Sequence, residues 1–93
     1  MTALLGKFPF MARKLAYWPT DVKADQIVAN AYAGASRGEK MAIEFLLHVW
    51  DPNMDWTTFG YQNFNLGMAL GTWSFPSDAS IAVAAWVGKP FFP

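Results

Sequence analysis

The sequence predicts an all-α fold: one small helical domain, residues 1–93, of four to five short helices with an aromatic loop at about residues 53–65. Apolar residues recur at helical spacing in several stretches, and capping residues, glycines and prolines bracket those stretches. The one stretch with strand-like composition lacks regular alternation. With 54% hydrophobic and 15% charged residues, the chain can bury one modest core.

Residues 1–19 are predicted to form an amphipathic N-terminal arm. Pro9 and Pro19 bracket a short helix over residues 10–18, because proline is tolerated at the first helical position and disfavours helix in the residue before it. Apolar side chains lie on one side of this helix, and Arg13 and Lys14 lie elsewhere on the turn.

A second helix is predicted from Thr20 to Gly34. Thr20 is a candidate N-cap, with Asp21 near the positive end of the helix dipole, and Gly34 can end the helix. One helical face is apolar and consists of Ala24, Ile27, Val28, Ala31, Tyr32 and Ala35.

The central helix is predicted to start after Ser36 and to end near Trp50. Ser36 and Glu39 have the spacing of a capping box, and Pro52 stops the helix. Its polar residues form one narrow stripe, so the helix should be buried on most sides. That stripe consists of Lys40, Glu44, His48 and Asp51.

The loop at residues 53–65 is predicted to contain at most one helical turn, capped by Asp55 or Thr57, although strand remains an alternative. Asn65 caps the next helix, which runs to Trp73. Gly67 and Gly71 would allow a neighbouring helix to approach this one closely.

The last predicted helix starts at Ser77 or Asp78 and ends at Gly88, with Pro90 beyond it. Four of its residues are expected to face inward: Ile81, Ala82, Ala85 and Trp86.

Composition excludes several classes of site. The chain has no cysteine and one histidine, and its formal net charge is zero. A thiolate metal site and a cysteine nucleophile are therefore excluded, and double-stranded DNA is an unfavourable partner. Glu44 and Asp51 flank His48 at helical spacing and could tune an acid or base or join it as metal ligands, but a surface histidine on the polar stripe explains the pattern better. We expect no enzyme activity, no cofactor and no metal.

The strongest functional signal is the aromatic content, with 8 Phe, 5 Trp and 3 Tyr. A domain of this size has little room to bury them all, and exposed aromatic residues anchor interfaces. The predicted function is non-catalytic protein–protein interaction, as an accessory, inhibitor or adaptor protein or as a homo-oligomer. The alternative is that these side chains simply fill the core. The predicted partner-binding residues are Trp56, Phe59, Tyr61, Phe64, Trp86, Phe91 and Phe92.

A second hypothesis is peripheral attachment to a membrane or to single-stranded nucleic acid, because the N-terminal region mixes cations with aromatic residues. That basic-aromatic site would consist of Lys7, Phe10, Arg13, Lys14 and Trp18. The favoured alternative is an amphipathic helix that packs its aromatic residues on the core. No secretory signal or transmembrane segment is predicted, so we expect a cytoplasmic location.

Three segments carry a resemblance to known sequences: residues 45–52 (FLLHVWDP), 69–73 (ALGTW) and 85–93 (AWVGKPFFP). Over about residues 20–93 the chain resembles short proteins carried on bacterial integrative and conjugative elements. The resemblance implies an accessory protein of a mobile element that binds a host protein. It implies no activity and transfers no functional residue.

Overall fold

The structure, a computed structural model, describes residues 2–12, 15, 17–19, 24–51, 53–73 and 77–90. These residues confirm the predicted all-α fold. The helices are α1 (Thr2–Leu5), α2 (Ala24–Ala33), α3 (Arg37–Trp50), α4 (Leu66–Trp73) and α5 (Asp78–Gly88), with short 3₁₀ helices η1 (Pro9–Met11) and η2 (Trp56–Phe59). The predicted cap at Thr20 and Asp21 lies outside the described residues.

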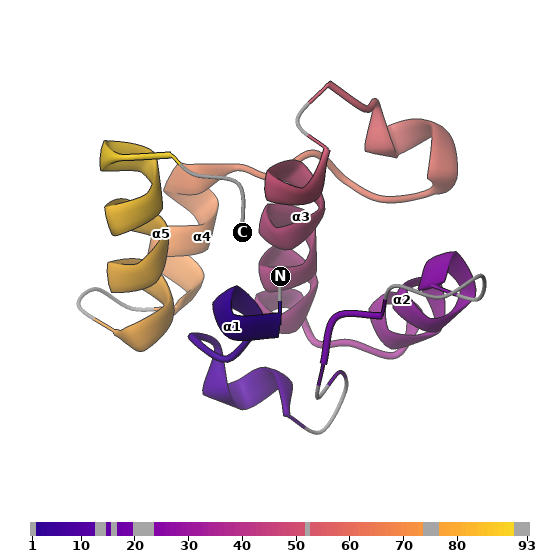
Figure 1. Ribbon diagram of the computed structural model, residues 1–93, viewed down its shortest axis with the longest axis horizontal. Helices are drawn as coiled ribbons and strands as arrows, with labels where there is room; N and C mark the ends of the chain where they lie inside the picture. The colour runs from indigo at the N-terminus through magenta and orange to yellow at the C-terminus, as the bar shows by residue number, and fades with distance from the viewer. Residues whose placement is uncertain are drawn as a thin grey trace.

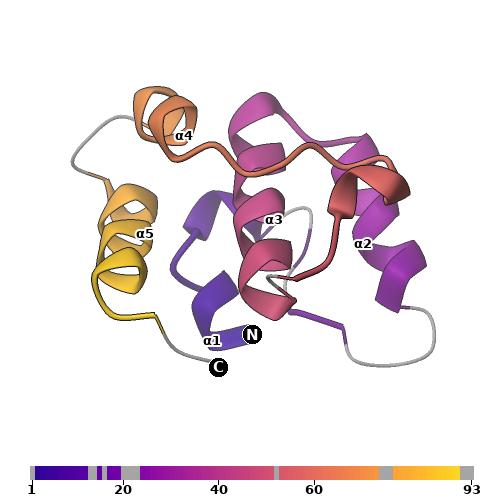
Figure 2. The same cartoon turned by 90° about the horizontal axis from the view of Figure 1, so that it is seen from above.

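Helix α3 lies at the centre of the molecule (Figure 1). Helix α2 packs against one side of it and α4 against another, while α5 packs on α4. Seen from above, the segment between α3 and α4 runs across α3 and connects the two sides of the fold (Figure 2). The central position of α3 agrees with its narrow polar stripe.

The helix starts follow the predicted capping chemistry. At α3, the Glu39 N–H donates to Ser36 Oγ (3.3 Å), and the Ser36 N–H donates to Glu39 Oε1 (2.8 Å). Ser77 caps α5 through a similar reciprocal pair with Ser80. Asn65 accepts the N–H of Met68 at the start of α4 (2.9 Å). These local bonds satisfy backbone groups that the first helical turn leaves unpaired.

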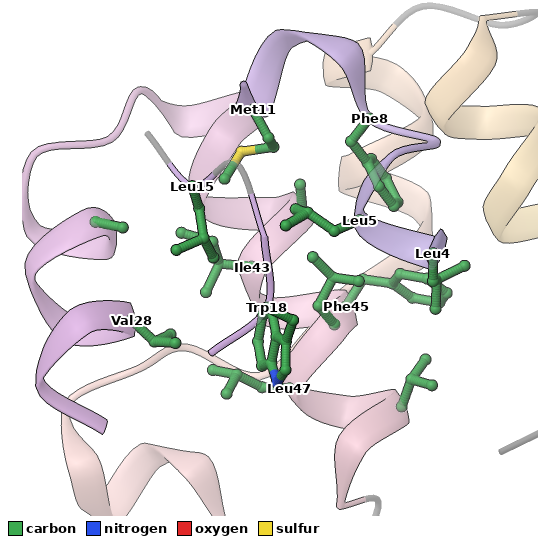
Figure 3. Packing of buried hydrophobic residues seen from close by; sticks show 14 of the residues in the cluster. Leu4, Leu5, Phe8, Met11, Leu15, Trp18, Val28, Ile43, Phe45 and Leu47 are labelled. Carbon is green, nitrogen blue, oxygen red and sulfur yellow. The ribbon is translucent and has the colours of Figure 1, made fainter. Parts of the chain in front are cut away.

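The N-terminal segment forms part of the core. Leu5, Phe8 and Met11 are buried, and they point toward Ile43 and Phe45 of α3 (Figure 3). Because this segment covers the face of α3 between α2 and α5, the core extends across the whole width of the fold.

The predicted helix over residues 10–18 is wrong in its described part. Only the 3₁₀ turn η1 forms, and residues 17–19 are not helical. Trp18 is buried with 3% of its surface exposed, and Pro19 follows it. The absence of helix at residue 18 agrees with the restriction that proline places on the preceding residue.

The predicted inward face of α5 also requires correction. Ile81 and Ala85 are exposed, whereas Ala79, Ser80 and Val83 are buried. Almost every residue of α5 is small or apolar, so its sequence has no strong periodicity and tertiary packing selects the buried face.

The predicted close approach of a neighbouring helix at Gly67 and Gly71 is not found. A Cβ on Gly71 would meet nothing within 4 Å, and a Cβ on Gly67 would meet only Asn65. A Cβ on Gly38 would lie 3.6 Å from the Trp73 ring, and the Trp73 Nε1–H donates to the Gly38 carbonyl (3.0 Å). A Cβ at this distance would make an ordinary van der Waals contact, so α3 and α4 meet here through the Trp73 indole and the Gly38 backbone carbonyl, without requiring glycine at position 38.

None of the helices in the described residues is both long enough and apolar enough to cross a membrane. The central helix α3 has 14 residues, whereas a spanning helix needs about 20.

Candidate functional site

A groove of about 490 Å³ lies between α2, the C-terminal end of α3 and the loop at residues 53–65. We call it the aromatic groove. It includes three of the predicted partner-binding residues, Trp56, Phe59 and Tyr61. Its lining residues are Val28, Ala29, Leu47, Trp50, Asp51, Met54, Trp56, Phe59 and Tyr61.

Trp56 attaches the loop to the end of α3. Its Nε1–H lies 3.1 Å from the Leu47 carbonyl oxygen and 3.2 Å from the Asp51 carbonyl oxygen. The indole is a second donor to both carbonyls, because the Leu47 carbonyl also accepts the Asp51 N–H (3.0 Å) and the Asp51 carbonyl accepts the Met54 N–H (3.2 Å). The position of the Trp56 ring is therefore set by the fold before any partner arrives.

The far end of the loop is held by α2. The Tyr61 ring packs edge-on against Tyr32, with ring centroids 4.8 Å apart. The Gln62 N–H donates to the Tyr32 hydroxyl (3.3 Å). Between these attachments Gly60 adopts a φ of +89°, a left-handed conformation that glycine adopts without steric cost and that turns the chain back.

The rim of the aromatic groove is exposed and apolar. Phe59 exposes 61% of its surface, Met54 41% and Trp50 39%. Trp56 is partly buried beneath them, and Tyr61 is buried at the base. The groove thus combines a fixed aromatic floor with large exposed side chains at its edge.

The other predicted partner-binding residues lie elsewhere. Phe64 is partly buried between the rings of Phe45 and Trp73. Trp86 packs edge-on against Phe45 and lines a separate groove between α1 and α5. Phe91 and Phe92 lie outside the described residues.

The predicted basic-aromatic site is only partly described. Lys7 and Phe10 are exposed, but they border different hollows of the surface. Trp18 is in the core, edge-on to Trp50, and offers no exposed ring for stacking on bases. Arg13 and Lys14 lie outside the described residues.

Glu44 is buried, with 8% of its surface exposed, although the sequence places it on the polar stripe of α3. The Tyr32 hydroxyl donates to Glu44 Oε2 (2.7 Å), and Lys40 Nζ lies 5.2 Å from the centre of the Tyr32 ring. Burial raises the pKa of the Glu44 carboxyl, which the Tyr32 hydrogen bond and the Lys40 charge only partly offset. Burial and the bond to Glu44 raise the pKa of Tyr32 to about 12.

A raised carboxyl pKa makes stability depend on pH. Where Glu44 keeps its proton in the native state and loses it in the unfolded state, the free energy of unfolding decreases as pH rises. This decrease starts near the ordinary pKa of about 4.3 and ends above the raised native pKa. We expect Glu44→Gln to flatten this part of the pH profile and Tyr32→Phe to steepen it, as measured by urea unfolding. Parallel profiles for wild type and Glu44→Gln would contradict the assignment.

His48 is exposed, and its ring lies edge-on to Trp86 with centroids 6.0 Å apart. Glu44, its predicted neighbour on the stripe, bonds to Tyr32 instead. In the described part of the chain, no group of three or more His, Cys, Asp or Glu side chains is placed to hold a metal ion.

Comparison with protein-family models, with curated proteins and with solved structures gave no match. The choice of the aromatic groove as the candidate site therefore rests on its geometry and composition.

Proposed function

We propose that this protein is a non-catalytic protein–protein interaction module that binds its partner through the aromatic groove. One observation carries the proposal: Trp50, Met54 and Phe59 remain exposed around a groove whose floor is already ordered. Apolar surface of this kind is favourable to cover, at about 25 cal/mol per Å².

The chemistry of the lining also favours binding over catalysis. Aromatic side chains with few rotatable bonds are the usual anchors of protein interfaces. Trp56 is fixed by its two hydrogen bonds, so ordering it costs little when a partner binds. Among the described residues that line the groove, Asp51 is the one carboxylate, and no serine, histidine or lysine lies beside it to form a nucleophile–base pair.

The partner can be another protein or a second copy of this chain, and an accessory role in a mobile element fits the first of these. Sedimentation equilibrium over a range of concentrations distinguishes them. A self-association that Phe59→Ala abolishes would identify the partner as a second copy.

Phe59→Ala is expected to remove partner binding and to leave the fold intact, because this side chain is mostly exposed. Ile81→Ala is the matched control, since Ile81 is 55% exposed on α5 and lies outside the groove. The measurement is affinity capture on the immobilised chain, followed by titration of the captured protein. We expect at least a tenfold weaker affinity for Phe59→Ala and an unchanged affinity for Ile81→Ala. Equal affinities for wild type and Phe59→Ala would contradict the proposal.

A further inference from the structure

The aromatic groove has a chemistry that selects among partners, and this inference rests on the proposed function. Three features of the groove attract a positive charge: aromatic rings, a carboxylate and the C-terminal end of α3.

Three aromatic rings surround Trp56 at close range. The Trp50 ring is stacked on it, with centroids 6.1 Å apart and an angle of 14° between the planes. The Phe59 and Tyr61 rings lie 6.0 and 6.1 Å from it, at 53° and 85°. The faces of aromatic rings carry negative charge density, so a cation within about 6 Å of a ring centre is attracted to it.

The indole N–H of Trp56 is already used. It donates to the carbonyl oxygens of Leu47 and Asp51. A ligand in the groove therefore finds no free N–H on this ring for an acceptor of its own. This favours a ligand that binds through a ring face, as a cation does.

Asp51 adds a full negative charge to the lining. It is the C-terminal cap of α3, and its Oδ1 accepts the N–H of Asn53 (3.2 Å). Its Oδ2 has no hydrogen-bond partner among the described residues. The C-terminal end of a helix dipole is also negative, so both the Asp51 carboxylate and the end of α3 attract a positively charged ligand.

No lysine or arginine occurs from residue 41 to residue 88, a stretch that supplies every part of the lining except Val28 and Ala29. Asp55, at the start of η2, adds a second carboxylate to the same loop. The negative charge of the lining is therefore not neutralised by cations of its own segment.

We propose that the aromatic groove binds an arginine side chain, presented by a partner protein between apolar neighbours. A guanidinium group is planar and weakly hydrated, so it stacks on an indole and donates to a carboxylate at the same time. The groove, at about 490 Å³, lies within the usual range for binding pockets, about 300 to 1,000 Å³, and has room for an apolar neighbour beside the arginine.

The test uses a blocked pentapeptide, Gly-Leu-Arg-Leu-Gly, titrated into the full chain labelled with ¹⁵N. Three matched peptides replace arginine by citrulline, which keeps the shape and loses the charge, by lysine, or by leucine. The indole N–H signals of Trp50 and Trp56 report occupancy of the groove. Asp51→Asn removes the carboxylate with no change of shape, and Asp78→Asn removes the same charge from α5, outside the groove.

We expect saturable shifts of both indole signals with the arginine peptide. The citrulline and leucine peptides should bind about tenfold more weakly. The affinity of the lysine peptide should lie between theirs and that of the arginine peptide. Asp51→Asn should lower the affinity of the arginine peptide for the chain about tenfold, whereas Asp78→Asn should leave this affinity unchanged. Equal affinities for the arginine, citrulline and leucine peptides, or no saturable shift with arginine, would overturn the inference.

The two proposals fail separately. Partner binding that depends on Phe59 but not on Asp51 would overturn the arginine inference and leave the interaction function in place. Indole signals that shift with protein concentration alone would identify a second copy as the occupant, and would also overturn the arginine inference. If the arginine peptide binds but Phe59→Ala leaves binding of the natural partner unchanged, the proposed function is contradicted and the arginine inference is not.

Discussion

Phe45→Ala is expected to lower the free energy of unfolding by about 3–5 kcal/mol, because it removes a fully buried ring from the middle of α3. Phe45 exposes 1% of its surface. Its ring lies 5.9 Å from Phe8, 5.2 Å from Phe64 and 5.6 Å from Trp86. It therefore joins the N-terminal segment, the loop before α4 and helix α5 to the central helix.

The measurement is urea unfolding followed by circular dichroism. Phe45→Leu is the more conservative comparison, because it keeps a buried apolar side chain and removes less volume, and it should cost less than Phe45→Ala. Phe59→Ala, at the exposed rim, should change stability by no more than about 0.5 kcal/mol. A loss below about 1 kcal/mol for Phe45→Ala would contradict the packing of α3 at the centre of the core.

Trp56→Ala is expected to lower the free energy of unfolding by about 2 kcal/mol, less than for a fully buried tryptophan because this ring is only partly buried. The substitution removes the donor to the Leu47 and Asp51 carbonyls and the contact with the Trp50 ring. The core around α3 stays intact. The substitution should therefore destabilise mainly the loop at residues 53–65, which should open locally while the rest of the fold stays folded.

Amide hydrogen exchange locates this opening. The Tyr61 N–H donates to the Trp56 carbonyl and the Gln62 N–H to the Tyr32 hydroxyl, both at 3.3 Å. Both amides should exchange faster in Trp56→Ala, while amides in the middle of α3 stay protected. Trp56→Phe loses the hydrogen bonds but keeps a smaller aromatic ring among Trp50, Phe59 and Tyr61, so its effect should be smaller. Uniformly faster exchange in α3 would show that Trp56 supports the global core instead.

The helices were predictable where the signal is local. Ser36 and Glu39 lie three residues apart and bond to each other, and Asn65 and Ser77 cap helices within their own first turns. Such contacts need no knowledge of the rest of the fold. The buried face of α5 depends on what α4 presents to it, and so could not be deduced from the apolar sequence of α5.

The N-terminal segment illustrates a second limit. Its aromatic and cationic residues were compatible with surface attachment or with packing on the core, and Phe8, Met11 and Trp18 are core residues. Sequence alone could not show that α3 leaves a long apolar face uncovered between α2 and α5. The N-terminal segment covers that face.

The candidate site was predictable in part. The density of aromatic residues pointed to Trp56, Phe59 and Tyr61, which the loop brings together. Trp50 and Asp51 were not predicted to join them, because that depends on the loop folding back over the end of α3. The indole of Trp56 bonds to carbonyls five and nine residues earlier, a contact with no sequence signature.

Glu44 shows how one missing contact reverses an interpretation. Its spacing with Lys40 and His48 predicted a solvent-exposed stripe. In the structure Tyr32 from α2 covers it and donates to its carboxylate. A tyrosine 12 residues away in sequence cannot be assigned to a carboxylate by periodicity, since the crossing of α2 and α3 decides which side chains meet.

The central claim is that the aromatic groove is the partner-binding surface, and site-specific photocrosslinking tests it most directly. Phe59 is replaced by p-benzoylphenylalanine in the full chain, expressed in its source cells, and Tyr17 is replaced in a second protein. Tyr17 is a matched control because it is an aromatic residue, is 57% exposed and does not line the groove. We predict a discrete covalent adduct from position 59 and none of the same mass from position 17. The absence of an adduct at position 59, or the same adducts from both positions, would contradict the account.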